Sequence, residues 1–484
     1  MKVLLISPPF EAIIHPTQKL VKGCMPPLSL MYLAGTLLKN GIETSILDLN
    51  ATPLTREGAA AEAVKFAPDL IGFTTYSANI ELTFGLARAL KLALPRAPIV
   101  LGGIHASYLP ENCLAEPAVD AVVRGEGELT LLELARAVES GTPWERIKGL
   151  VYRGGGALVH TRPRETVRDI DSLPWPAHRL IDVNRYFPAI TRAITGGPFS
   201  SVLTMRGCAY RCSFCSHHYG YGGAVRLRSI TDVADEIEFL RRGLGVRELQ
   251  FEDNSFSWRP DRALALCRLL RERKLGVSWN CTMRADTASE ELLREMKAAG
   301  CERILLGAES GDQAVLDRMH KGHTLEQVSA TARWARKYGI RVNCSFVLGM
   351  PGDTEATLRS SFGLALELDP DYVMFSVLTP SVGSEIFDRA VADGKIEKRD
   401  VKGERYMIVY SEYPPLLEMS EVPAARLKRL MEEFTLGFYA RPRYILRRLA
   451  GLGSPRELLR LFFGAAIIAR HQLLKLLRRE ARNA

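Results

Sequence analysis

The sequence predicts an α/β protein in three parts, because two stretches alternate strand and helix signals and the last stretch is helical. Up to about residue 140, short apolar runs typical of buried strands alternate with stretches of helical periodicity. The alternation resumes near residue 196 and continues to about residue 395, and beyond residue 400 only helical periodicity remains. Repeated β-α units favour parallel sheets, which bind ligands at the carboxyl ends of their strands.

The first part, residues 1–140, is expected to form a doubly wound parallel sheet. Residues 2–7 are a continuous apolar run, and the helical periodicity that follows ends at Gly41, a residue type that commonly terminates helices. The expected strands cover 2–7, 43–49, 69–74, 98–101 and 119–123, and the expected helices cover 27–40, 80–94 and a stretch from about residue 130.

A connector over 141–195 follows. Apolar pairs flank Gly154-Gly-Gly156, which predicts a small hairpin. Pro174 and Pro176 exclude a helix around Trp175. We expect Trp175 to pack at the seam between the two α/β parts.

The second α/β part, residues 196–395, is expected to contain six strands. They cover 201–205, 249–251, 277–280, 303–306, 341–348 and 372–378, and helices over 229–243, 261–274, 289–300, 325–339 and 354–368 separate them. The last part, residues 396–484, is expected to hold helices over 420–436 and 454–479.

Composition limits the location and the partners of the chain. The amino terminus has the pattern of a buried strand and not of a secretion signal, so the nine cysteines are expected to be cytoplasmic thiols or metal ligands. No apolar run reaches the length of about 18 residues that spans a membrane. Residues 441–484 carry eleven Lys and Arg against two acidic residues, which accounts for the net charge of +9. This apolar and basic tail suits either peripheral contact with the inner membrane surface or packing on the second α/β part. No nucleic-acid partner is expected, because aromatic residues are not interleaved with the charges.

Three cysteines follow the first strand of the second part at C-x3-C-x2-C spacing. Thiolates bind soft metal centres, and three of them on one [4Fe–4S] cluster leave one iron open to a ligand. The residues are Cys208, Cys212 and Cys215, and the aromatic Phe214 before the last of them would shield the cluster from water. A structural zinc site is the alternative, but it normally uses four ligands in paired C-x2-C units.

This motif resembles that of the radical S-adenosylmethionine (SAM) family. The resemblance implies a partial (β/α)6 barrel in which the open iron binds SAM and one electron cleaves it to a 5′-deoxyadenosyl radical. It also implies that Glu252 and Asp253 bind the amino group of SAM, that Glu309 and Ser310 bind its ribose or methionine end, and that Ser345 flanks its adenosine. Lys321-Gly-His-Thr324 stands where the family often has K-G-x-T. Capping of strand ends is the structural alternative for each of these residues.

The first part resembles the Rossmann-like cobalamin-binding domain that precedes the barrel in many of these enzymes. The resemblance lies in Ser7-Pro-Pro9, Pro26-Pro-Leu28, Gly102-Gly-Ile-His105 and Gly125-Glu-Gly-Glu128. It implies that Gly102 and Gly103 approach the cofactor, with hydroxyls of Thr74, Thr75 and Ser77 beneath it and His105 as a hydrogen-bonding loop residue. The D-x-H-x-x-G motif is absent, so cobalamin would bind without that axial histidine; a purely structural domain is the alternative.

The resemblance implies that the adenosyl radical removes hydrogen from an unactivated carbon, to which cobalamin then delivers a methyl group. Oxidative cyclisation or rearrangement of a hydrophobic substrate such as a tetrapyrrole is the alternative chemistry. A non-catalytic cobalamin or cluster sensor is a third alternative, although a sensor needs no open iron. The expected partners are a small, hydrophobic substrate and an electron donor such as flavodoxin or ferredoxin.

Overall fold

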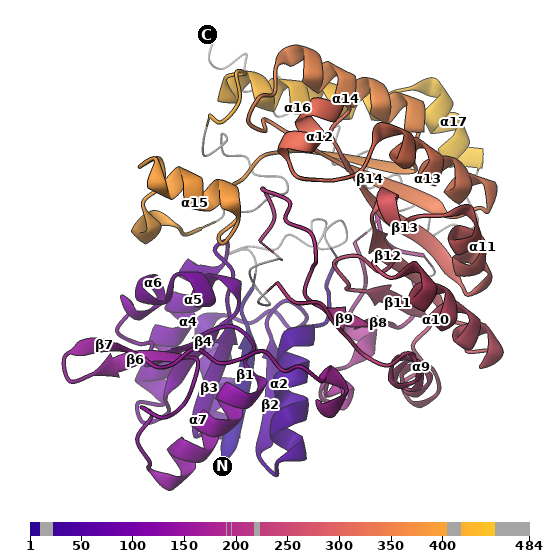
Figure 1. Cartoon of the computed structure of the whole chain (residues 1–484). Helices are drawn as coiled ribbons and strands as arrows, with labels where there is room; N and C mark the ends of the chain where they lie inside the picture. Colours follow the sequence, from indigo (N-terminus) through magenta and orange to yellow (C-terminus); the bar gives the residue numbers. More distant parts are fainter. Residues whose placement is uncertain (10–22, 190, 195, 217–222, 404–417, 451–484) are drawn as a thin grey trace.

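The structure, a computed structural model, describes residues 1–9, 23–189, 191–194, 196–216, 223–403 and 418–450. Two sheets form the frame, and Figure 1 shows the amino-terminal sheet below the barrel sheet with its outer helices. Within the described residues, no helix is long and apolar enough to cross a membrane. The expected helix over 454–479 lies outside the described residues.

The first sheet has the strand order β2-β1-β3-β4-β5-β6-β7. Pairing is parallel from β2 to β5, as the repeated β-α units predicted, and antiparallel for β6 and β7. The order reverses between β1 and β3, and loops that diverge at such a point leave a crevice for a ligand. The strands are β1 (Lys2–Ser7), β2 (Glu43–Asp48), β3 (Leu70–Thr74), β4 (Ile99–Gly102), β5 (Ala121–Val123), β6 (Leu150–Gly154) and β7 (Ala157–His160).

Helices cover both faces of this sheet. Val3 and Leu5 point toward one core and Leu4 and Ile6 toward another, because successive residues of a strand face opposite sides. Three helices were not expected from the sequence: α3, whose buried residues are all alanines and carry little periodic signal, and the short α5 and α6. The helices are α2 (Leu28–Lys39), α3 (Arg56–Phe66), α4 (Ile80–Ala93), α5 (Ile104–Tyr108), α6 (Pro110–Leu114) and α7 (Glu128–Ser140).

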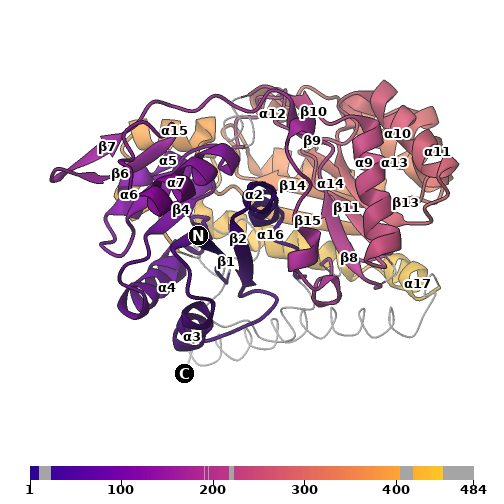
Figure 2. The same cartoon turned by 90° about the horizontal axis from the view of Figure 1, so that it is seen from below.

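The hairpin expected in the connector is present, and it extends the first sheet. β6 pairs with β5, and the Arg153 guanidinium at its end donates to the carbonyl oxygens of Val119 (2.5 Å) and Glu116 (2.8 Å). Trp175 lies at the expected seam: its indole nitrogen donates to Asp232 at 2.8 Å, while its carbonyl oxygen lies against Gly35 of α2. Figure 2 shows α2 between the two sheets.

The second sheet contains the six parallel strands expected, in the order β15-β14-β13-β12-β11-β8. The strands that contain Thr282 and Glu309 are longer than expected. Such polar residues interrupt the apolar pattern, so the sequence placed the strand ends too early. The strands are β8 (Phe199–Val202), β11 (Glu248–Phe251), β12 (Ser278–Met283), β13 (Cys301–Glu309), β14 (Arg341–Leu348) and β15 (Tyr372–Val377). The first strand was expected over 201–205, but it ends at Val202, and β9 (Met205–Arg206) turns away to pair with β10 (Arg226–Leu227).

Helices on the outer face of this sheet complete the partial barrel. Ser and Thr residues cap several of them; the Thr324 and Gln327 side chains, for example, form a reciprocal capping box. The helices are α9 (Ile230–Glu238), α10 (Pro260–Glu272), α11 (Glu290–Ala298), α12 (Gln313–Arg318), α13 (Leu325–Lys337) and α14 (Glu355–Leu368).

The carboxyl-terminal helices attach to both domains. α15 (Glu385–Ala392) was not expected, and its Phe387 shares a small core with Leu109 of the first domain. α16 (Ala424–Tyr439) packs on β15 through a stack of phenylalanines that includes Phe434. α17 (Pro442–Ala450) follows α16 along the barrel, where the Arg447 guanidinium pairs with Asp369.

Candidate active site

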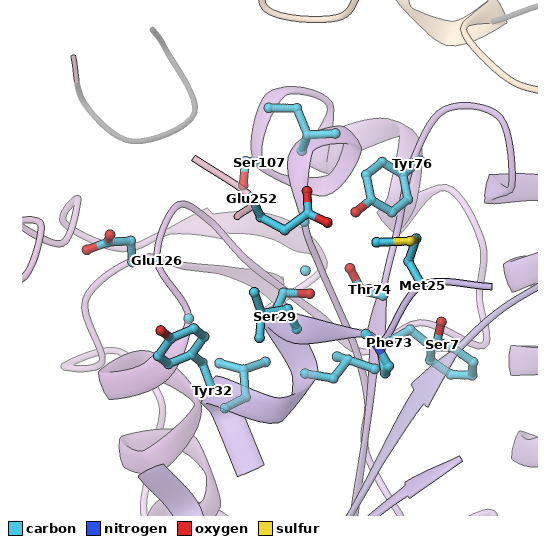
Figure 3. A pocket seen from close by; sticks show the side chains of 18 of the residues that line it. Ser7, Met25, Ser29, Tyr32, Phe73, Thr74, Tyr76, Ser107, Glu126 and Glu252 are labelled. Carbon is cyan, nitrogen blue, oxygen red and sulfur yellow. The ribbon is translucent and has the colours of Figure 1, made fainter. Parts of the chain in front are cut away.

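A cavity of about 970 Å³ lies between the carboxyl edge of the first sheet and the mouth of the barrel. Residues from both domains line it, and Figure 3 shows Thr74 and Tyr76 of the first domain facing the same space as Glu252 of the barrel. Thr74, Ser77, Gly102 and Gly103, all expected at a cofactor edge, are among the lining residues.

The two glycines have different roles. Gly103 has a φ of 99°, and a Cβ there would lie 2.7 Å from the Thr75 carbonyl oxygen. Glycine is therefore needed at this position because the protein's own backbone approaches it closely. A Cβ on Gly102 would meet no atom closer than 3.9 Å, so the missing side chain leaves cavity space that a ligand can occupy. This edge of the first sheet therefore leaves room for a cofactor at Gly102.

Thr75 and His105 support this edge from behind and do not line the cavity. The Thr75 hydroxyl donates to the Gly102 carbonyl oxygen at 2.8 Å. The His105 ring is buried, with Nδ1 2.9 Å from the Ser77 hydroxyl and Nε2 3.3 Å from the Asn112 amide oxygen. Burial lowers the pKa of His105 to about 4, so the ring is neutral near pH 7. His105 thus makes hydrogen-bonding contacts, but it lies in the short helix α5 and not in a loop as expected.

The three motif cysteines lie half-buried on the loop that follows β9. The Cys215 amide donates to the Cys212 carbonyl oxygen at 3.0 Å, which folds the loop back on itself. Among the described residues, no three Cys, His, Asp or Glu side chains form a preassembled metal-holding group. The donor set nevertheless suits an iron–sulfur cluster in its chemistry, because it offers three soft thiols beside cationic side chains.

Those cations are Arg284 and Lys321. One Arg284 nitrogen lies 3.8 Å from the Cys212 sulfur, and its guanidinium stacks 3.5 Å from the centre of the Tyr210 ring. Burial raises the pKa of the Cys208 thiol, while both cations oppose that rise by favouring the thiolate. Sequence reasoning missed Arg284; its position directly after the strand over 278–283 was the only available signal.

Phe214 is half-buried. It contacts a cluster that includes Met319 and Met350, and the Lys321 ammonium lies 5.9 Å from the centre of its ring. The ring therefore packs one side of the cysteine loop against the barrel, and its shielding of a cluster stays a prediction.

Glu309, at the end of β13, comes together with Ser345 of β14. The Lys321 ammonium donates to one Glu309 oxygen at 2.8 Å, and the Ser345 hydroxyl reaches the other at 3.4 Å. A Cβ on Gly307 would lie 2.2 Å from the Glu309 carboxylate, so this carboxylate position requires glycine. Ser310 points elsewhere: its hydroxyl accepts from the Asp312 amide and lies 3.4 Å from the Ser361 hydroxyl on α14.

Glu252 and Asp253 are neighbours in sequence but face different surroundings. Glu252 lines the cavity and accepts from Gln250 at 2.7 Å; burial raises its pKa. The buried Asp253 carboxylate accepts from the Thr204 amide and hydroxyl, both at 2.7 Å, and from the Met205 amide at 3.1 Å. Burial raises the pKa of Asp253 to about 6 despite these hydrogen bonds. Its carboxylate therefore holds the backbone that leads into the cysteine loop.

The loop Gly125-Glu-Gly-Glu128 joins the two domains. Glu126 pairs with Arg206 at 3.3 Å and with Arg226 at 2.8 Å, and Glu128 pairs with Arg206 at 2.6 Å. These four side chains are almost fully buried, and we call them the interdomain clasp. Because Arg206 lies two residues before Cys208, the clasp ties the first domain to the base of the cysteine loop.

Comparison with known proteins identifies both domains. The chain matches the family model "B12 binding domain" over residues 18–135 and "Radical SAM superfamily" over residues 202–365. It is 30% identical over 448 residues to an uncharacterised methyltransferase of Pyrococcus horikoshii, covering 92% of this chain and 94% of that protein. It is 28% identical to the anaerobic magnesium-protoporphyrin IX monomethyl ester cyclase of Rubrivivax gelatinosus, covering 80% of this chain and 69% of the cyclase.

The fold is also shared with a solved structure. The radical SAM methyltransferase TsrM of Kitasatospora setae, solved with cobalamin and a [4Fe–4S] cluster, matches with a TM-score of 0.68 at 22% identity, covering 81% of this chain and 78% of TsrM. The two domain matches, together with the long alignment to the Pyrococcus protein, show which family this is. The chain belongs to the radical SAM enzymes that carry a cobalamin-binding domain, and its cofactors are a [4Fe–4S] cluster, SAM and cobalamin.

Proposed function

We propose that this enzyme methylates an unactivated carbon of a small molecule that binds between its two domains. The observation that carries the proposal is the shared cavity, which has Ser77 and Gly102 on one wall and Glu252 and Gly207 on the other. A substrate in this space would contact the cobalamin edge and the cysteine-loop side of the barrel together. Methylation of an unactivated sp³ carbon requires such an arrangement, because no acidic proton is available for ordinary displacement.

We assign the cofactor-holding roles as follows. Cys208, Cys212 and Cys215 would hold the cluster, and the Glu309–Lys321 pair would bind SAM. Thr74, Ser77 and Gly102 would line the cobalamin face. When bound, the cluster supplies an electron, SAM supplies the adenosyl radical and the methyl group, and cobalamin carries that methyl group.

The remaining residues around the loop have supporting roles. Arg284 and Lys321 favour the thiolate form that binds iron. Phe214 keeps water from one side of the loop, and Asp253 fixes the backbone from which the loop begins. Apolar side chains such as Leu203 and Met205 in the cavity wall would keep water away from a substrate radical.

The test is anaerobic incubation of the reconstituted enzyme with SAM carrying a deuterated methyl group, a reductant and extract from the source cells. Methyl transfer by this route yields one 5′-deoxyadenosine and one S-adenosylhomocysteine per methylated product. We expect both in equal amounts, dependent on cobalamin, with the label in a new product seen by mass spectrometry. Cys212→Ala should lose iron and all SAM cleavage; cleavage retained by this variant would refute the assignment of the cluster.

Oxidative cyclisation is the second candidate, because the cyclase of Rubrivivax gelatinosus is among the relatives. Cyclisation transfers no methyl group, so it would produce 5′-deoxyadenosine without S-adenosylhomocysteine. That result would replace the methylation proposal.

We further propose a cytoplasmic location and a small electron-transfer protein, such as flavodoxin or ferredoxin, as the reductant. Contact of the carboxyl-terminal region with the inner membrane surface is supported by the apolar side chains that α17 exposes, with Ile445 45%, Leu446 67% and Leu449 49% exposed. Sedimentation of the full chain with anionic vesicles, compared with a Leu446→Ser variant, would test that contact.

A further inference from the structure

We propose that Arg192 binds an acidic group of the substrate, so that the substrate is a carboxylate or a phosphate ester with an apolar body. This inference rests on the proposed function, since it names the class of molecule that occupies the shared cavity. The geometry that carries it is a cation in the cavity wall that forms no ion pair with the described residues.

The segment that carries Arg192 is anchored beneath the barrel. The Asn343 amide donates to the Thr191 carbonyl oxygen at 2.8 Å, and the Ile194 amide donates to the Glu248 carboxylate at 2.8 Å. Asn343 and Glu248 lie near the amino ends of β14 and β11. The backbone around Arg192 is therefore fixed at the amino-terminal side of the barrel, while its side chain lines the cavity with Glu252.

The Arg192 guanidinium makes no ion pair or side-chain hydrogen bond with any described residue. Among the described residues, Glu252 is the one charged group whose field acts on it, and that carboxylate lies beyond ion-pair distance. Burial lowers the pKa of Arg192 and raises that of Glu252, so each charge is costly in this place. The Arg192 side chain is half-buried, so water compensates its charge only in part, and an anionic ligand would compensate it further.

The other cation on the cavity wall already has carboxylate partners. Arg206 lines the cavity too, but the interdomain clasp engages it with Glu126 and Glu128. Among the cavity-lining residues that the structure describes, Arg192 is thus the one cation without a carboxylate partner. The Glu309–Lys321 pair lies outside the residues that line this cavity, so Arg192 is separate from the proposed SAM site.

Two buried amides of neighbouring barrel strands have side-chain atoms without a partner among the described residues. The buried Gln250 lines the cavity, and its side-chain oxygen has no hydrogen-bond partner among the described residues. Asn280, its register partner on β12, is fully buried with neither amide atom bonded in the described part of the chain. Gln250 and the apolar Leu203 and Met205 all line the cavity, and together with Arg192 they fit an acid that carries a hydrocarbon body.

The test measures binding to the cofactor-reconstituted enzyme by calorimetry with three probes: hexanoate, hexyl phosphate and the neutral hexanamide. Because Arg192 would form a charge-assisted hydrogen bond with an anion, we expect the wild type to bind one of the two anions about 10- to 100-fold more tightly than the amide. Arg192→Gln and Arg192→Met should abolish this preference, and Arg192→Lys should retain part of it. Arg259→Gln is the matched control, because Arg259 is exposed, pairs only with Asp261 among the described residues and does not line the cavity.

Three results would overturn the proposal: no anion preference in the wild type, a preference unchanged in both uncharged variants, or loss of bound cobalamin or of SAM affinity in those variants. The last result would assign Arg192 to a cofactor. Preference for hexanoate identifies a carboxylate, and preference for hexyl phosphate identifies a phosphate. Because binding is measured without turnover, an enzyme that forms no methylated product would refute the proposed function while leaving this result intact.

Discussion

Glu309 shows at the scale of one residue how the site is held. Its φ of 64° lies in the left-handed region, which is uncommon for a residue with a side chain and occurs where surrounding contacts impose it. The ammonium of Lys321 at 2.8 Å and the open side of Gly307 provide those contacts. This conformation therefore holds the carboxylate at one position in the barrel mouth.

We expect Glu309→Ala to weaken SAM binding by about 10- to 100-fold, because it removes a charge-assisted hydrogen-bond acceptor. Equilibrium dialysis with the cluster-loaded enzyme would measure the affinity, with iron content as the check that the cluster is intact. Glu326→Ala is the control, since Glu326 is exposed and pairs with Arg333. Equal affinities in the variant and the control would remove Glu309 from the SAM site.

His105 makes stability depend on pH. Its pKa is about 4 in the folded chain and 6.5 in the unfolded chain, so between these values only the unfolded state binds the proton. The stabilisation is complete above pH 6.5 and decreases as the pH falls toward 4, by up to about 3 kcal/mol. Urea unfolding of the cofactor-free chain at pH 5 and pH 7 should show a smaller decrease for His105→Gln than for the exposed-site control His160→Gln. Identical decreases would contradict the assignment.

At the scale of elements, the cysteine loop depends on the end of a neighbouring strand. β8 ends at Val202, and the Asp253 carboxylate that follows β11 then accepts the amides of Thr204 and Met205. The loop thus begins from a backbone that two strands hold. Its direction comes from this contact across 49 residues of sequence.

We expect Asp253→Ala to lower both the free energy of unfolding, by about 3 kcal/mol, and the iron content after reconstitution. The substitution leaves buried donors at Thr204 and Met205 without an acceptor, and each such donor costs about 1–3 kcal/mol. Asp261→Ala, at an exposed carboxylate, is the control. Normal iron content in the Asp253 variant would show that this anchor does not support the loop.

At the scale of the whole molecule, the interdomain clasp sets how the two domains face each other. Removing one member leaves a buried charge unpaired, which costs about 3–5 kcal/mol, whereas an exposed pair contributes less than about 1 kcal/mol. Arg206→Met should therefore destabilise the chain far more than Arg259→Met, and a second substitution, Glu128→Gln, should restore part of the loss.

A double-mutant cycle in urea, together with proteolysis of the connector, would measure the effect of the clasp. Additive losses in the cycle would show that Arg206 and Glu128 are not coupled. Unchanged proteolysis of Arg206→Met would show that the clasp does not hold the domains together.

Local patterns in the sequence predicted most of the frame. Apolar runs and helical periodicity are properties of neighbouring residues, so the parallel sheet, the six barrel strands and the hairpin could be predicted and are confirmed. The spacing of Cys208, Cys212 and Cys215 is also local, and it indicated the family before any fold was known. Helix α3 was missed because its alanine-rich face carries little periodic signal.

The tertiary structure decided which polar residues meet. Sequence reasoning gave Glu252 and Asp253 one role, yet one lines the cavity and the other holds Thr204, because adjacent residues on an extended backbone point in opposite directions. The pairing of Glu126 with Arg226 spans 100 residues, and the exposure of Arg192 to the cavity depends on where its segment crosses the barrel. By itself, the sequence determined the cluster motif and the order of strands and helices. Only the tertiary structure determined which charged residues pair, because ion pairing depends on distance in space. Local periodicity in the sequence carries no information on that distance.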